Sequence, residues 1–134
     1  MNNDTGDNAP PTPPPVLPRI LVVDDNKDAA DSLSALLQFL GAEVYLAYEG
    51  ISALELIARH RPSVVLLDLV MPGVDGYEVA RRVRQDPQLA GLKLIALTAL
   101  GQEEDRRRTS EAGFDQHLVK PLSPEAIHKL LDAL

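Results

Sequence analysis

Five short apolar runs, each followed by a helical pattern, occupy most of the chain from Arg19 onward. They lie at residues 20–23, 44–47, 64–67, 92–97 and 114–119. The run at 64–67 is apolar at every position, which is typical of a parallel strand that is buried on both faces. Strands that alternate with helices at this spacing predict five βα units and a doubly wound α/β sandwich around a parallel sheet.

The segments between the runs have apolar residues at helical spacing. In the first of them, the predicted buried stripe is Ala29, Leu33, Leu36, Leu37 and Leu40, and Gly41 is predicted to end the helix. The segment 102–112 predicts a highly charged helix. Its three arginines at 106–108 follow three acidic residues at 103–105, and this spacing predicts a solvated face that pairs its own charges.

The first 18 residues differ in composition from the rest of the chain. They contain six of its 11 prolines, together with Asn, Asp and Thr. Such a segment cannot bury an apolar core, so residues 1–18 are predicted to be a disordered, proline-rich linker. The remaining residues, 19–134, are enough for one domain.

Charge and composition exclude several classes of protein. The net charge of −7 argues against direct binding of nucleic acid, which requires clustered Lys and Arg. No apolar run approaches the roughly 18 residues of a membrane span, so no direct membrane contact is predicted. The absence of cysteine excludes thiolate metal sites and agrees with a cytoplasmic location.

Polar residues stand at the carboxyl ends of four of the five predicted strands. Asp24 and Asp25 follow the first, Asp68 the third, Thr98 and Ala99 the fourth, and Lys120 the fifth. In open parallel sheets, ligands bind outside this edge. The sequence therefore predicts that these side chains share one site, although each residue alone would be read as a helix cap, a turn or a surface residue.

The chemistry of this set indicates phosphoryl transfer. Three carboxylates at one edge repel each other and require a cation, and oxygen ligands without Cys or His favour Mg²⁺. Lys120 adds a positive charge and Thr98 a hydroxyl donor. An aspartate that faces these groups can act as the nucleophile and form an aspartyl-phosphate.

Four segments together resemble the response regulator receiver family of two-component signalling. They are ILVVDDN at 20–26, VVLLDLVMPGVDG at 64–76, IALTA at 95–99 and HLVKP at 117–121. The resemblance covers residues 19–134. It implies a flavodoxin-like (βα)5 sandwich with strand order 2-1-3-4-5. The sequences at residues 25–30 and 112–121 are similar to those found in the receivers of hybrid histidine kinases.

The resemblance also implies a role for each site residue. Asp68 matches the phosphate acceptor, Asp25 the direct Mg²⁺ ligand and Asp24 a ligand through water. The Val70 carbonyl matches the remaining protein ligand. The resemblance further implies that the Thr98 hydroxyl and the Ala99 amide hold the phosphate, that Lys120 pairs with its oxygens, and that Lys120–Pro121 is a cis bond.

The sequence departs from the family at His117, where an aromatic switch residue is common. Because of His117, the sequence does not define how a change at Asp68 is passed on to the output face. The resemblance implies that Val70 and Leu100 flank the acceptor; both are apolar and cannot orient a hydrolytic water, which predicts slow self-dephosphorylation. The output face is expected to comprise the helix at 102–112, the strand at 114–119 and the last helix, and it is a possible homodimer surface.

The resemblance implies a switch that accepts phosphoryl groups from a histidine kinase or a histidine phosphotransfer protein. Such a protein catalyses only its own phosphorylation and dephosphorylation. No output domain is expected after residue 134. The main alternative is a flavodoxin-like FMN-binding electron carrier, which Asp24 and Asp25 disfavour because they would repel the phosphate. A phosphatase with an aspartyl nucleophile lacks the expected Asp-x-Asp after the first strand.

Overall fold

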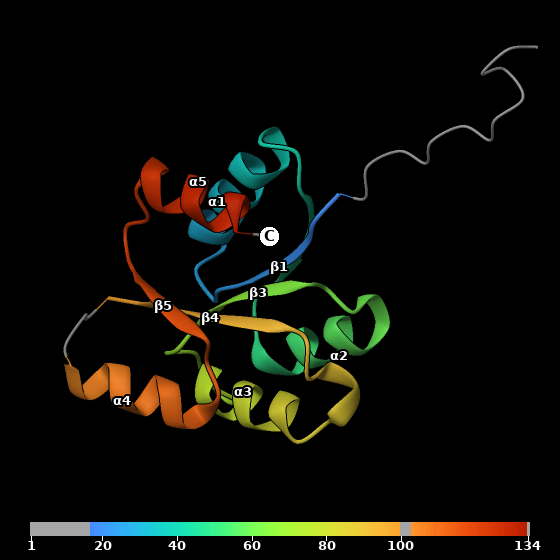
Figure 1. The fold of residues 1–134 in the computed structure, drawn as a ribbon, viewed down its shortest axis with the longest axis vertical. Coiled ribbons are helices and arrows are strands. Elements are labelled where there is room, and N and C mark those ends of the chain that lie inside the picture. Colours follow the sequence, from blue (N-terminus) through green and yellow to red (C-terminus); the bar gives the residue numbers. More distant parts are fainter. Residues whose placement is uncertain (1–16, 100–102, 134) are drawn as a thin grey trace, which may run out of the picture.

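The computed structural model describes residues 17–99 and 103–133. In these residues, parallel strands alternate with helices (Figure 1). The elements are β1 Arg19–Val23, α1 Lys27–Phe39, β2 Glu43–Ala47, α2 Gly50–His60, β3 Val64–Asp68, α3 Gly76–Arg84, η2 Pro87–Leu89, β4 Lys93–Thr98, α4 Glu103–Ala112, β5 Gln116–Val119 and α5 Pro124–Asp132. The predicted αβ alternation is confirmed.

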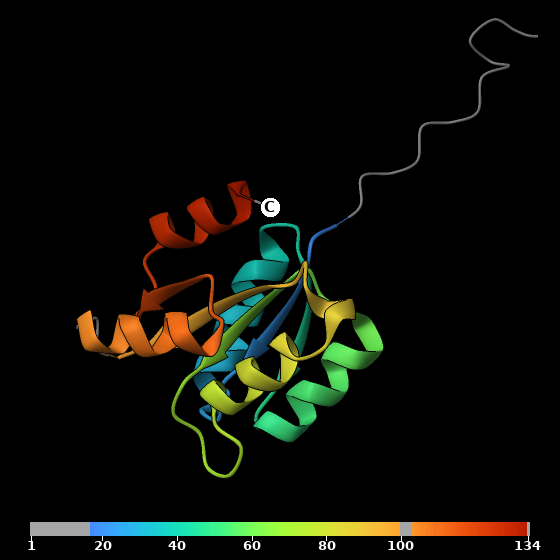
Figure 2. The same cartoon turned by 60° about the horizontal axis from the view of Figure 1, so that its bottom comes forward.

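All five strands form one parallel sheet in the order β2-β1-β3-β4-β5, as the resemblance implied. Figures 1 and 2 show α1 and α5 on one face of the sheet and α2, α3 and α4 on the other. β3 lies in the centre and is buried along its whole length. This explains its unbroken apolar sequence, because neither of its faces meets water.

Each face of the sheet has its own apolar core. Leu21, Val65 and Leu67 point to the α2–α3–α4 side, where they pack with Ile57 and Val79. Ile20, Val22, Leu66 and Ile95 point to the α1–α5 side and pack with residues of those helices. The alternation of neighbouring residues between the two cores fixes the register of the strands.

The turn after β3 is held tightly against the sheet. The N–H of Gly76 donates to the carbonyl of Leu69 at 3.2 Å, and a Cβ at Gly76 would collide with the carbonyl of Asp68. The Asp75 side chain caps α3 by accepting from the N–H of Glu78 at 2.9 Å. These contacts fix the backbone at the carboxyl end of β3.

The predicted buried stripe of α1 is wrong in part. The helix buries Ala30, Ser34 and Leu37, whereas Ala29 and Leu36 are exposed. The sequence pattern placed the apolar stripe on the face that points toward α5. The sheet instead covers the adjacent face of the helix, so part of the stripe lines an open groove.

The arginines at 106–108 of α4 are exposed, as predicted, whereas their pairing with the acidic side chains at 103–105 stays a prediction. The Arg106 Nε lies 3.1 Å from the Nε2 of His117 on β5, and the Arg108 guanidinium lies 4.3 Å from the ring centre of Tyr77 on α3. Two of the three arginines therefore contact neighbouring elements. α4 also buries Thr109 and Ala112, so it is joined to the body of the protein by these small side chains together with the two arginines.

The limits of the described residues concern the predictions made for the linker at 1–18 and for Leu100. Pro18 belongs to the described part, where its carbonyl accepts from the N–H of Glu43 at 2.9 Å. Leu17 is described as well, and only residues 1–16 of the predicted linker lie outside the described residues, as does Leu100. None of the described helices has the length and hydropathy that crossing a membrane requires.

Candidate functional site

The acidic residues predicted from the strand ends come together at the carboxyl edge of the sheet. Carboxylate oxygens of Asp24, Asp25 and Asp68 all lie within 4.8 Å of one another. β1 and β3 are direct neighbours, with Val23 opposite Leu67, so the residues that follow them are adjacent in space. Asp24 and Asp68 are buried, whereas Asp25 is exposed.

Lys120 reaches the same cluster from the loop after β5. Its Nζ lies 2.7 Å from Oδ2 of Asp24 and 3.5 Å from Oδ2 of Asp68. The backbone N–H of Lys120 donates to the carbonyl of Thr98 at 2.8 Å, which connects this loop to the end of β4. The Lys120–Pro121 bond is cis, as the resemblance implied.

The environment perturbs two of these groups. Burial raises the pKa of the Asp68 carboxyl to about 6; Lys120 opposes this rise, and the nearby Asp24 reinforces it. Burial disfavours the charge of Lys120, but its hydrogen bond to Asp24 and the charges of both aspartates outweigh that cost and raise the Lys120 pKa. The site therefore favours a charged lysine beside a carboxyl that resists ionisation.

The donor set of the cluster matches the requirements of Mg²⁺. Three carboxylates converge on one point, and among the described residues Lys120 alone forms ion pairs with them, which leaves an excess of negative charge. Hard divalent cations bind to such oxygen ligands, and Mg²⁺ in particular uses few carboxylates and keeps several waters. Asp24, Asp25 and Asp68 are thus the residues that could hold it.

The other predicted site residues lie at the same edge of the sheet or close to it. Thr98 is buried at the end of β4, and Ala99 after it is exposed. The Val70 N–H donates to Oδ1 of Asp68 at 3.3 Å, and its side chain is 81% exposed. His117 lies earlier on β5, opposite Ala96, and its imidazole contacts Arg106 on α4 rather than the acidic cluster.

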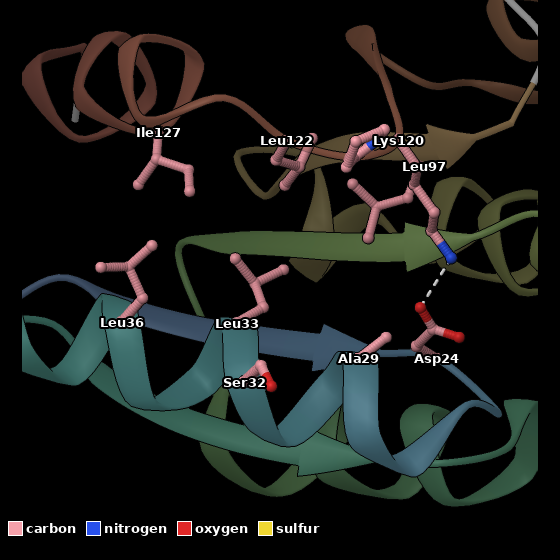
Figure 3. A pocket seen from close by; sticks show the side chains of 10 residues that line it. Asp24, Ala29, Ser32, Leu33, Leu36, Leu97, Lys120, Leu122 and Ile127 are labelled. Atoms are coloured by element: carbon pink, nitrogen blue, oxygen red, sulfur yellow. Dashed lines mark hydrogen bonds and ion pairs between the residues drawn. The ribbon is translucent and has the colours of Figure 1, made fainter.

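An apolar groove of about 550 Å³ opens beside the site, between α1 and the loop that leads into α5. Figure 3 shows Leu33 and Leu36 of α1 facing Leu122 and Ile127 across it, with Lys120 and Asp24 at one end. Sequence reasoning missed this groove. The available signal was the wide apolar stripe of α1, which was assigned to the core.

A central parallel sheet in the order 2-1-3-4-5, with an acidic cluster and a lysine at its carboxyl edge, defines a receiver-type protein. The family model for the response regulator receiver domain matches residues 20–132. The chain therefore belongs to the response regulator receiver domain family of two-component signalling. This assignment gives no support to the FMN-binding alternative.

Individual relatives agree with the family. The chain is 36% identical over 118 residues to the DNA-binding dual master transcriptional regulator RpaA of Synechocystis, in a match that covers 88% of this chain and 49% of that protein. The chain thus spans about half the length of this curated relative. Chemotaxis protein CheY4 of Vibrio cholerae has a TM-score of 0.83 at 30% identity, over 88% of this chain and 98% of that one.

A third relative is the receiver domain of a sensor histidine kinase from Pseudomonas aeruginosa. Its structure has a TM-score of 0.80 to this chain at 31% identity and covers 88% of this chain and 97% of that one. That structure was solved with a magnesium ion coordinated in its active-site cleft. Similarity to this domain does not make the present chain part of a hybrid kinase, because other receivers match equally well.

Proposed function

We propose that the chain is a phosphorylation-dependent switch that accepts a phosphoryl group on Asp68 from a phosphohistidine donor, with Mg²⁺. The observation that carries this proposal is the position of the Lys120 ammonium, 3.5 Å from Oδ2 of Asp68 within the acidic cluster. An ammonium that faces a carboxylate nucleophile can balance the charge of an incoming phosphoryl group. The structure of the Pseudomonas relative, with magnesium in its cleft, supports the choice of metal.

The proposed reaction is a displacement at phosphorus. An Asp68 carboxylate oxygen forms a bond to the phosphorus while the bond between phosphorus and the donor imidazole nitrogen breaks, and the imidazole leaves with that electron pair. Lys120 shifts toward the phosphoryl oxygens, and the Thr98 hydroxyl and Ala99 N–H donate to them. Asp25, Asp68, the Val70 carbonyl and, through water, Asp24 would hold Mg²⁺, which would supply charge neutralisation when bound.

The donor is a histidine kinase or a histidine phosphotransfer protein. The groove between α1 and α5 gives it a place to dock, because the groove is apolar and ends at Lys120 and Asp24. Lys120 and Asp24 at this end of the groove (Figure 3) both belong to the cluster around Asp68, so a donor docked in the groove would lie beside the acceptor. The folded domain at residues 19–134 would then act as one unit behind the proline-rich linker at 1–18, in the cytoplasm.

Phosphorylation would change the face formed by α4, β5 and α5. The phosphoryl group adds roughly −1.5 to −2 charges, which draw Thr98 and Lys120 inward. The backbone N–H of Lys120 donates a hydrogen bond to the Thr98 carbonyl, so the ends of β4 and β5 would move together. His117 and its contact with Arg106 then couple this movement to α4, and the altered face serves a partner or a second copy of the chain.

Loss of the phosphoryl group is expected to be slow. The Val70 side chain stands exposed beside Asp68 and has no polar atom with which to hold an attacking water. After removal of acetyl phosphate, the adduct should persist for minutes or longer with Mg²⁺ present. Val70→Asn should shorten this lifetime, because an amide can orient water. Decay of the wild type within seconds would contradict the expectation, as would an unchanged rate in the variant.

The proposed function is tested by incubating the chain with acetyl phosphate and measuring its intact mass. With Mg²⁺, the spectrum should show one added phosphoryl group. With EDTA in place of Mg²⁺, the addition should be nearly lost, because the single charge of Lys120 does not offset the repulsion between three carboxylates and the donor. Failure to acquire the group with Mg²⁺ present, in a chain that melts cooperatively, would refute the proposal.

A further inference from the structure

A second hollow lies at the end of the sheet opposite to Asp68, where the strands begin. Its volume is about 580 Å³, and its lining includes the cations Arg19, Arg61 and Lys93. A smaller hollow of about 190 Å³ adjoins it and shares the residues Arg61, Ser63 and Gly91. The two form one groove, which we call the basic groove. The phosphorylation chemistry makes no use of it.

The charge of the basic groove is opposite to that of the chain. The sequence has 20 acidic residues and a net charge of −7. Among the described residues, however, none that lines either hollow is acidic. Arg19 is partly neutralised by Glu43 at 3.4 Å, whereas Lys93 forms no ion pair with any described residue. The groove is therefore a local concentration of positive charge.

Arg61 provides an independent observation. It ends α2 in the left-handed conformation, with φ 46° and ψ 63°, at a position where glycine is the usual residue. A side chain is strained in this conformation, and such strain is often found where a residue serves a function. The Arg61 Nη2 donates to Oε1 of Gln88 at 2.9 Å, which holds the guanidinium beside the smaller hollow.

Capping of α2 does not account for these cations. The carbonyl of His60 at the end of the helix already accepts from Nη1 of Arg19 at 3.0 Å. Arg59 and His60 place further basic side chains in the last turn. Lys93 begins β4 and belongs to no helix. Arg61 and Lys93 therefore remain for another role.

The shape of the groove favours an extended ligand over a single small anion. The N–H of Ser63 donates to the carbonyl of Arg19 and the N–H of Lys93 to that of Ser63, both at 3.0 Å, so three neighbouring strands start side by side. Arg19 and Lys93 thus stand on strands about 10 Å apart, which corresponds to about three residues of extended peptide. Leu17 and Leu131 add apolar surface to the larger hollow.

We propose that the basic groove binds an acidic peptide segment of a partner protein, with carboxylates on Arg61 and Lys93 and an apolar side chain on Leu17 and Leu131. The site lies at the end of the sheet where β1 begins (Figure 1). Binding is independent of phosphorylation at Asp68, because that site is at the opposite edge. The segment is recognised by charge, so its affinity falls as salt rises.

The test is fluorescence anisotropy of the full chain with a fluorescein-labelled peptide of Glu and Leu. Binding should saturate, weaken with added NaCl and be the same in Asp68→Asn. Lys93→Glu should weaken it about tenfold, since charge reversal exchanges an attraction for a repulsion. Lys129→Glu, at an exposed lysine of α5 outside the groove, is the matched control and should bind like the wild type.

Arg61→Gly separates a binding role from a structural one. Glycine adopts a positive φ without strain, so the melting temperature should stay the same or rise while peptide binding weakens. A lower melting temperature with unchanged binding would overturn the proposal. So would the absence of binding, equal binding of a Lys/Leu peptide, or displacement of the peptide by phosphate at low concentration, which would indicate a site for small anions.

Discussion

Replacing Asp68 with Asn should abolish the phosphoryl adduct that acetyl phosphate and Mg²⁺ give the wild-type chain. The amide of Asn keeps the shape of the side chain, but its oxygen carries no charge with which to attack phosphorus. Intact mass spectrometry measures the result. Asp75→Asn is the matched control: Asp75 caps α3 outside the acidic cluster, and Asn caps a helix equally well. This control should keep the adduct.

The same substitution should make the metal-free protein more stable at neutral pH. Folding raises the pKa of Asp68 to about 6 from an ordinary value of 3.8. The folded state thus binds more protons than the unfolded chain between these values, and stability falls as pH rises through them. The loss is absent below about pH 4 and complete above about pH 6, where it is on the order of 3 kcal/mol.

Asp68→Asn removes this titration. Chemical denaturation in EDTA at pH 7.5 should therefore show a more stable variant, and the difference should shrink toward pH 4. An adduct that survives in Asp68→Asn would show that phosphorylation occurs elsewhere. A variant that loses the adduct but is less stable than the wild type at neutral pH would show that Asp68 contributes to folding in a way that its burial does not explain.

Much of the site could be predicted because parallel strands bring their carboxyl ends together. Asp24, Asp68 and Lys120 are far apart in the sequence, but each follows a recognisable apolar run. Once the runs are read as parallel strands, the sheet places these residues at one edge, and the structure brings all three into contact. The strand order came from the family resemblance, because apolar periodicity does not define which strands are neighbours.

The contacts of long side chains could not be predicted in this way. Arg106 and Arg108 stood beside acidic residues in the sequence, and helical spacing favoured local pairing. Their partners, His117 and Tyr77, lie on other elements. The face of α1 that meets the sheet was misassigned for a related reason: its apolar stripe extends over both the core and the open groove, and a sequence pattern does not separate these two environments.

Replacing Lys120 with Met should slow phosphorylation by about 10²-fold, the usual cost of losing one charged group that stabilises developing charge. Methionine retains much of the length and apolar surface of lysine. Rates are measured with acetyl phosphate at saturating Mg²⁺. Lys129→Met, at an exposed lysine of α5, is the matched control and should react at the wild-type rate.

Two further measurements distinguish the loss of a charge from the loss of the site. Without Lys120, only the hydrogen bond from the Val70 N–H still opposes the effects of burial and of Asp24 on Asp68, so the Asp68 pKa should rise above about 6. A ¹³C NMR titration of the carboxyl group in metal-free protein measures this rise. The acidic cluster also becomes more negative, so calorimetry should show Mg²⁺ binding at least as tightly as in the wild type. If Lys120→Met reacts slowly and also binds Mg²⁺ weakly, the substitution has disrupted the cluster itself, and the slow rate no longer supports a direct role for the Lys120 ammonium beside Asp68.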